Sequence, residues 1–199
     1  MGAKGRRSNP DLNELLFQHG YEFDFFQAVR LLTLIGKGRR GVGRAERPDN
    51  EVARFGAHLT LSFPPSPVHD IVENKDGPHA VTVAAFGLTG TQGVLPHFYT
   101  EHMIMRHLMR DDAMAAFLDL FNHRLMSFFY RAWEKHHPVI GYEQKAATGR
   151  VPDNFTQYLF DLVGMGTPGL RGRLSIPDEA LLYYGGLVAQ RPHSAAAVR

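Results

Sequence analysis

The sequence predicts an α+β fold that is mainly helical, with a small antiparallel β insertion between the second and third helices. Two observations carry this prediction. Apolar residues recur every three or four positions from 112 to 136, which is the spacing of one face of a helix. Short β-like segments lie between 52 and 87, and clusters of proline, glycine, asparagine and aspartate that are typical of turns separate them.

Two short helices open the predicted fold. The first begins at Asp11 and ends at Gly20, because glycine suits the left-handed backbone that follows a helix. The second covers residues 24–35, where apolar side chains again recur at helical spacing. Residues 36–49 hold four glycines and five basic residues without apolar periodicity, so they predict a long exposed loop.

Four β-like segments follow, at residues 52–55, 58–63, 68–73 and 80–87. The last two predict an antiparallel hairpin, because the turn-forming residues 74–78 separate them and apolar side chains alternate along the second segment.

Two helices are predicted after the hairpin. Pro96 is placed to begin one that runs to about residue 110, since the first turn of a helix does not need the missing proline N–H. Asp111 is placed to cap a longer helix over residues 112–136. The apolar stripe of the longer helix is Met114, Phe117, Leu118, Phe121, Leu125, Phe128, Phe129 and Ala132. Its polar residues off that stripe are Asp119, His123, Arg124, Arg131 and Glu134.

The remaining chain predicts helices at residues 154–165 and 177–190, joined by a Gly/Pro loop at 166–172. Residues 141–153 read as another loop. Ser194 is placed to cap a further helix that ends almost at once.

A length of 199 residues fits one domain or two small ones. We expect a disordered lead at residues 1–10 and a single mainly helical domain at 11–190, with the β insertion at about 52–87. We expect residues 191–199 to begin a truncated further region.

Composition excludes several classes of function. The chain has no cysteine, so it has no disulfide, thiolate zinc site, iron–sulfur cluster or cysteine nucleophile. No apolar run reaches the length of a membrane span, and no apolar stretch follows the basic first residues as in a signal peptide. We therefore expect a cytoplasmic protein without direct membrane insertion.

A net charge of +2 is too small for the basic stripe of a nucleic-acid binder, so we expect no nucleic-acid partner. The basic segment 37–47 is the one place where phosphates could be contacted. Four glycines break up the stretch of chain that holds this segment, which is typical of a solvated connector. Nucleic-acid binding by this segment is kept only as a minor alternative.

The glycines at 87, 90 and 93 follow a β-like segment and precede a helix, which is the context of a phosphate-binding loop. The loop lacks both the G-x-G start of a dinucleotide turn and the Gly-Lys-Ser/Thr of a P-loop. We favour a turn that lets hairpin and helix approach closely, since bulky residues would block that approach. A small-ligand or nucleotide-binding enzyme that uses this loop is the alternative.

Other catalytic patterns are absent from the sequence. His97, His102 and His107 are five residues apart and diverge around a helix instead of converging on one ion. No G-x-S-x-G nucleophile motif occurs. We therefore expect no enzyme and assign no catalytic, metal-ligating or cofactor-binding residue and no cofactor.

Aromatic residues occur in adjacent groups, as at 25–26, 128–130 and 183–184. Neighbours on a helix point about 100° apart, so one member of each group lies off the main apolar face. Exposed aromatics are typical of protein interfaces, and a core two layers thick would also accommodate them. Both interpretations stay open, and Tyr130 and Trp133 are our candidates for an interface.

An ordered series of motifs resembles the TssG family, also called ImpH or VasB. The longest are AFGLTGTQGVLPHFYTEHM (85–103) and FLDLFNHRLMSFFYRAWEKH (117–136), and shorter ones are FDFFQAVRLL (23–32), VARF (52–55), LSFPP (61–65) and LYYGGL (182–187). The match spans about residues 11–194. Thr91 departs from the family loop, where a proline is expected. The residues taken as family-motif or interface candidates are Gly87, Gly90, Gly93, Pro96, Tyr99, Tyr130 and Trp133.

The resemblance implies a non-enzymatic wedge subunit of the type VI secretion baseplate. Such a subunit joins TssF, TssE and TssK into a wedge, and several wedges surround the spike hub. The complex lies at the cytoplasmic face of the bacterial inner membrane. Members of the family continue beyond such an end, so the resemblance also implies that this chain is the N-terminal portion of a longer protein.

Overall fold

The computed structural model describes residues 11–36, 38–74, 76–148, 154–167 and 169–188. The chain divides into two compact units, Met1–His136 and His137–Arg199, called here the N-terminal and C-terminal units. The predicted lead, the predicted further region and Ser194 lie outside the described residues. The single domain expected over residues 11–190 stays a prediction.

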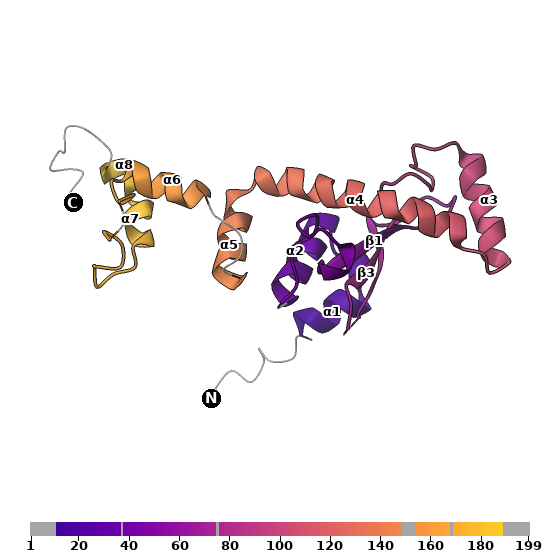
Figure 1. The fold of residues 1–199 in the computed structure, drawn as a ribbon, viewed down its shortest axis with the longest axis horizontal. Coiled ribbons are helices and arrows are strands. Elements are labelled where there is room, and N and C mark those ends of the chain that lie inside the picture. Colours follow the sequence, from indigo (N-terminus) through magenta and orange to yellow (C-terminus); the bar gives the residue numbers. More distant parts are fainter. Residues whose placement is uncertain (1–10, 37, 75, 149–153, 168, 189–199) are drawn as a thin grey trace, which may run out of the picture. The chain divides into compact units, whose positions relative to one another are not determined.

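The N-terminal unit is mainly helical and carries its strands between the second and third α-helices, as predicted (Figure 1). Its α-helices are α1 (Leu12–Gln18), α2 (Phe25–Ile35), α3 (His97–Leu108) and α4 (Ala113–Lys135). Two short 3-10 helices, η1 (Gly20–Glu22) and η2 (Pro48–Asn50), lie between them. The strands are β1 (Ala53–Ala57), β2 (Val68–Val72) and β3 (His79–Val83).

The three strands form one mixed sheet in the order β1-β3-β2. β2 and β3 are antiparallel, which confirms the predicted hairpin. β1 pairs with β3 in parallel, from Ala53 opposite His79 to Ala57 opposite Val83. The prediction of a purely antiparallel insertion was therefore wrong.

The predicted strand at 58–63 was also wrong, because these residues lie outside the sheet. The strand order explains the difference. β3 occupies the place between β1 and β2, so the chain has to cross from one edge of the sheet to the other after β1. Residues 58–67 make that crossing, and their three prolines suit a connection better than a strand.

One row of side chains across the sheet forms the centre of the core. Phe55, Val81 and Ile71 are paired across the three strands, and each is 1% exposed. Phe25 of α2 packs on this row, with its ring centroid 5.5 Å from that of Phe55. Most core residues come from α1, α2 and the strands, and α4 adds Met126 and Tyr130.

Helix α4 runs along the free edge of β1. Two backbone N–H groups of β1 that point away from β3 donate to side chains of α4: Phe55 N to His123 Nδ1 at 3.2 Å, and Ala57 N to Asp119 Oδ1 at 3.0 Å. A Cβ atom at Gly56 would lie 2.9 Å from Asp119 Oδ2, so the glycine lets the helix come this close. An open sheet edge invites pairing with other chains, and α4 covers this one with polar side chains.

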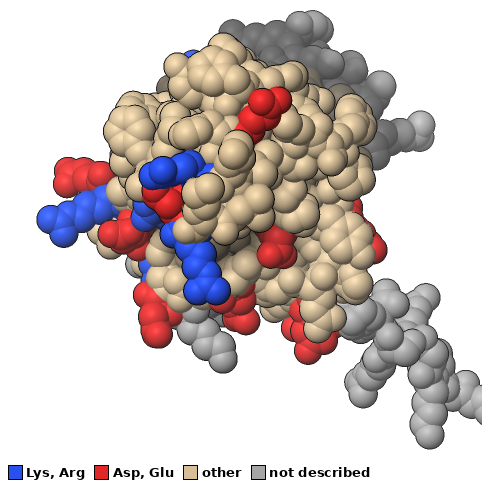
Figure 2. Space-filling view, turned by 90° about the vertical axis from the view of Figure 1, so that its right-hand side faces the viewer, with Lys and Arg blue, Asp and Glu red and all other residues tan. Residues whose placement is uncertain are grey.

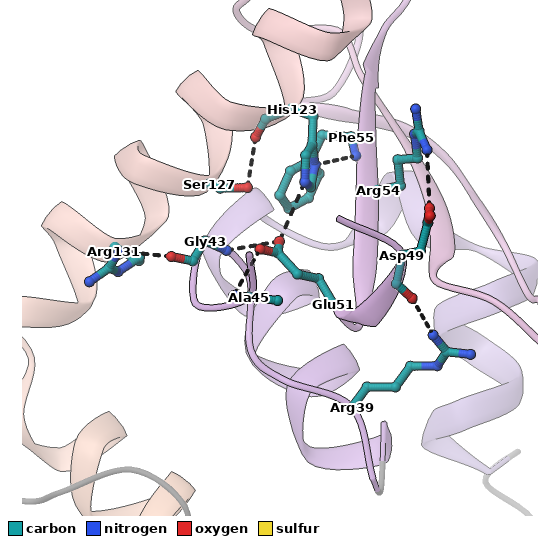
Figure 3. Close-up of polar contacts among 10 residues, drawn as sticks. All are labelled: Arg39, Gly43, Ala45, Asp49, Glu51, Arg54, Phe55, His123, Ser127 and Arg131. Carbon is teal, nitrogen blue, oxygen red and sulfur yellow. Dashed lines mark hydrogen bonds and ion pairs between the residues drawn. The ribbon is translucent and has the colours of Figure 1, made fainter. Parts of the chain in front are cut away.

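Behind this edge lies the buried carboxylate of Glu51, which is 0% exposed. It accepts hydrogen bonds from Gly43 N at 2.8 Å and Ala45 N at 3.3 Å (Figure 3). His123 Nε2 lies 3.4 Å from Glu51 Oε2. Because His123 Nδ1 accepts from Phe55 N, the ring proton belongs on Nε2 and faces the carboxylate. Glu51 therefore joins the loop to α4.

The loop predicted as exposed at 36–49 is partly buried. Val42 is 1% exposed and Ala45 is 7% exposed. α4 holds the same loop from its other side, since Arg131 donates to Gly43 O at 2.8 Å and Glu134 accepts from Arg44 at 2.7 Å. Gly43, one of the glycines that suggested a solvated connector, has φ +66° and donates its N–H to Glu51, so here glycine lets the loop turn inward.

The C-terminal unit contains α5 (Pro138–Thr148), α6 (Asn154–Leu162), α7 (Glu179–Tyr183) and α8 (Gly185–Val188). The prediction of a loop at 141–153 was wrong for residues 141–148, which belong to α5. Residues 149–153 lie outside the described part of the chain. α6 confirms the helix predicted at 154–165. The helix predicted at 177–190 is interrupted at Tyr184, between α7 and α8. The Gly-Gly pair that follows Tyr184 has a low helix propensity, which fits the interruption.

The C-terminal unit is held together locally around Phe160, which is 5% exposed. The Arg171 guanidinium lies over the Phe160 ring, 4.0 Å from its centroid. Arg171 also donates to Gln157 Oε1 at 2.8 Å and to Met165 O at 3.2 Å, which ties the loop after α6 to the helix.

We predict that Glu51→Gln lowers the free energy of unfolding by about 2–4 kcal/mol at pH 7, because the neutral amide pairs poorly with donors that surround a buried carboxylate. Urea unfolding measures this change. Glu46→Gln, at an exposed position of the same loop, is the control and should stay within experimental error of the parent. Equal stability of the Glu51 variant and the parent would contradict the assigned role.

The Glu51 carboxylate also predicts that the free energy of unfolding depends on pH. Burial by itself raises the pKa of Glu51, but the hydrogen bonds with His123, Gly43 and Ala45 outweigh it and the pKa is lowered. The stabilisation is thus present above the ordinary glutamate pKa of about 4.3 and is lost as pH falls through the lowered value. Glu51→Gln should lack this component of acid destabilisation.

We predict that Asp119→Ala destabilises the fold by about 1–3 kcal/mol, because Ala57 N–H then has no acceptor at the sheet edge. Asp119→Asn is the matched variant, since its amide oxygen still accepts from Ala57 N. Thermal and urea unfolding should rank the parent first, the asparagine variant second and the alanine variant last. Identical unfolding curves for the two variants would refute edge capping by Asp119.

Candidate functional site

The outward side of α4 is apolar. Its large exposed side chains, called here the α4 apolar face, are Phe117, Leu120, Phe121, Leu125, Phe128 and Phe129, which are 47–57% exposed. An amphipathic helix of a globular protein ordinarily turns such a stripe toward the core. α4 does the opposite, and it confirms the predicted helix while leaving its apolar stripe largely in solvent.

The inward side of α4 carries polar residues next to the core residues Met126 and Tyr130, and contacts with the backbone explain the polar ones. Asn122, His123 and Ser127 are at most 2% exposed. Asn122 Oδ1 accepts from Leu88 N at 2.9 Å, next to the sheet-edge bonds of Asp119 and His123. Buried N–H groups at a sheet edge and in a loop need acceptors, and apolar side chains offer none. These polar residues therefore face inward beside the core residues Met126 and Tyr130, whereas the six residues of the α4 apolar face remain half exposed.

Helix α3 adds a second exposed apolar group. Phe98 is 59% exposed, Met105 58%, Leu108 79% and Met109 70%. Figure 2 looks at the side of the N-terminal unit that carries α3, where uncharged residues cover a broad area, Lys and Arg gather toward the left, and Asp and Glu are scattered. Two outward apolar surfaces thus belong to consecutive helices.

The glycine loop between β3 and α3 is packed against its neighbours. Gly90 has φ +100°, a left-handed conformation that glycine adopts readily, and its N–H donates to Thr100 Oγ1 at 3.1 Å. A Cβ at Gly93 would lie 2.6 Å from the carbonyl carbon of Thr89. A Cβ at Gly87 would lie 3.4 Å from the Cβ of Ala57. These distances favour the interpretation of the loop as a close-packing turn.

The same loop uses its N–H groups internally. Leu88 and Gly90 donate to side chains of α4 and α3, and Gly93, Val94 and Leu95 donate to carbonyls of the loop itself. A phosphate-binding loop instead points its N–H groups at the ligand. This geometry argues against the nucleotide-binding alternative.

Pro96 and Tyr99 mark the start of α3. The helix begins at His97, directly after Pro96, as the sequence predicts. The Pro96 carbonyl accepts from Tyr99 N at 3.0 Å. The ring of Tyr99 is partly buried beside Phe98, with centroids 4.1 Å apart. Both residues therefore shape the junction between the glycine loop and α3.

Tyr130 and Trp133, the interface candidates from the sequence, are not the most exposed aromatics of α4. Tyr130 is 1% exposed and belongs to the core. Trp133 is partly buried and stacks on Phe26 of α2, with centroids 4.6 Å apart. The exposed aromatics of α4 are Phe117, Phe121, Phe128 and Phe129. The interface role of Tyr130 and Trp133 stays a hypothesis.

Within the described residues, no group of three metal-ligating side chains could hold an ion. No helix in the described part of the chain is long and apolar enough to cross a membrane.

No curated protein and no solved structure matches the chain significantly. The family model for TssG of type VI secretion does match, over residues 19–199. That range contains both outward apolar surfaces, the glycine loop and the sheet-edge contacts of α4. The chain therefore belongs to the TssG family of type VI secretion proteins.

Proposed function

We propose that this chain is a structural, non-catalytic wedge component of the type VI secretion baseplate. In this role it joins TssF, TssE and TssK around the spike hub, at the cytoplasmic face of the inner membrane. Family membership gives the secretion system. The resemblance of the sequence motifs gives the baseplate partners.

The α4 apolar face is the observation that carries the scaffold role. Monomeric proteins rarely expose large contiguous apolar patches, and such patches mark sites of interaction. Six large side chains of one helix are each about half exposed. Covering the exposed half of one such side chain contributes roughly 1 kcal/mol, so the complete face offers a substantial gross free energy of association.

We predict that Leu125→Glu prevents assembly with co-expressed TssF and TssK. Leu125 is 54% exposed, so a carboxylate there leaves the fold intact but becomes desolvated in any interface. Size exclusion with light scattering measures the complex, and circular dichroism should give an unchanged melting temperature.

Leu174→Glu is the matched control, since Leu174 is 49% exposed and lies in the C-terminal unit. A full yield of complex with Leu125→Glu would refute docking through this face. Fluorescence of Trp133, the single tryptophan of the chain, gives a second readout. An unmoved emission on addition of a tryptophan-free partner fragment would refute the interface hypothesis for Trp133.

We also predict that Gly90→Val reduces co-purification of TssF. The left-handed backbone at Gly90 strains a β-branched residue by about 1–3 kcal/mol, which alters the turn that places α3. Gly141→Ala is the control, because a Cβ at Gly141 meets nothing within 4 Å. Thermal unfolding separates a local change from global loss of the fold. An unchanged yield of complex would contradict a positioning role for the loop.

A further inference from the structure

A regular seam of apolar residues runs along α4 and shares Phe121, Leu125 and Phe128 with the α4 apolar face. Its six positions alternate steps of four and three residues: Met114, Leu118, Phe121, Leu125, Phe128 and Ala132. One step of four and one step of three together make the seven-residue repeat of a left-handed coiled coil. In heptad terms Leu118, Leu125 and Ala132 occupy a positions, and the other three occupy d positions. Phe121, Leu125 and Phe128, at the centre, are 47–54% exposed.

Charges beside this seam have one sign. Arg124 and Arg131 are seven residues apart, and both precede an a position, which makes them g positions. Arg124 lies over the ring of Phe128, 4.7 Å from its centroid, so its charge stays next to the seam. Arg131 donates to Gly43 O through one nitrogen and is otherwise exposed.

The acidic residues of α4 are turned the other way. Its two carboxylates, Asp119 and Glu134, serve the sheet edge and Arg44. The exposed charges of α4 are Arg124, Arg131 and Lys135. A partner on this seam therefore meets apolar side chains with positive charge along one side, at the g positions.

A second copy of the chain does not complement such a surface. In an antiparallel pair the g positions of the two helices face each other, so arginine would meet arginine. In a parallel pair g faces e, and the e positions of α4 are Ala115, Asn122 and Phe129, none of which is acidic. Charge complementarity thus favours a different chain.

We propose that the α4 apolar face receives an amphipathic helix of another protein, with apolar residues at heptad spacing and acidic residues flanking them. This inference rests on the proposed function, because it specifies the occupant of the same docking face. Glutamates at the partner's e and g positions pair with Arg124 and Arg131, and its a and d side chains cover the seam.

The test uses two synthetic 28-residue peptides and the 199-residue chain. Both peptides carry leucine at a and d and alanine at b, c and f, and differ only in glutamate or lysine at e and g. Like charges keep each peptide from pairing with itself, and circular dichroism verifies helicity. Fluorescence anisotropy of the labelled peptide measures affinity. We expect the glutamate peptide to bind at least tenfold more tightly than the lysine peptide.

Variants identify the surface and its charge. Arg124→Glu should weaken binding of the glutamate peptide roughly threefold to tenfold and improve binding of the lysine peptide. Arg173→Glu, at an exposed position of the C-terminal unit, makes the same change of charge and should alter neither affinity. Leu125→Glu should abolish binding of the glutamate peptide.

Each contrary outcome has a distinct meaning. Equal affinity of the two peptides overturns the acidic partner, and binding that survives Leu125→Glu overturns the location. Binding of neither peptide overturns a helical occupant. In that case the docking face itself still stands if Leu125→Glu prevents assembly with TssF and TssK, and falls if it does not. Self-association of the parent that Leu125→Glu abolishes would make a second copy the occupant.

Discussion

The free edge of β1 is the constraint on which the N-terminal unit depends. Its outward N–H groups at Phe55 and Ala57 need acceptors, and α4 supplies them from His123 and Asp119. Four residues of helix rise about 6 Å and two residues of strand about 6.6 Å, so the two spacings match with the elements antiparallel. Gly56, between the two donors, leaves room for this approach.

This constraint sets the rotation of α4 about its own axis. The side chains that satisfy the sheet edge and the loop are polar, so the polar side of the helix faces inward, and Glu51 extends the same bonding to the loop before β1. The apolar stripe is left on the opposite side. Hydrogen bonds are directional, whereas apolar contacts tolerate rotation, so α4 presents its apolar face in a defined orientation.

Periodicity and turn residues predicted α1–α4, α6 and the β2–β3 hairpin, because these signals are local. The parallel pairing of β1 was not predictable in this way, since it depends on which strand lies between two others. The buried side of α4 was missed for a related reason: Asp119 and His123 face inward through contacts with residues more than 60 positions away. The three neighbouring aromatics at 128–130 are too many for one narrow face of a helix. They were the signal that α4 has apolar side chains on its inward side, such as Tyr130, and on its outward side, such as Phe128.

An outward apolar helix has a consequence for the lifetime of the subunit before it is assembled. A chain that waits alone displays Phe121, Leu125 and Phe128 to solvent, and such surfaces are what aggregation and cellular quality control act on. In the proposed assembly a partner covers this surface and removes that signal. Docking of this kind would couple the abundance of the unassembled chain to the supply of its partner, because a surplus of this chain would be turned over.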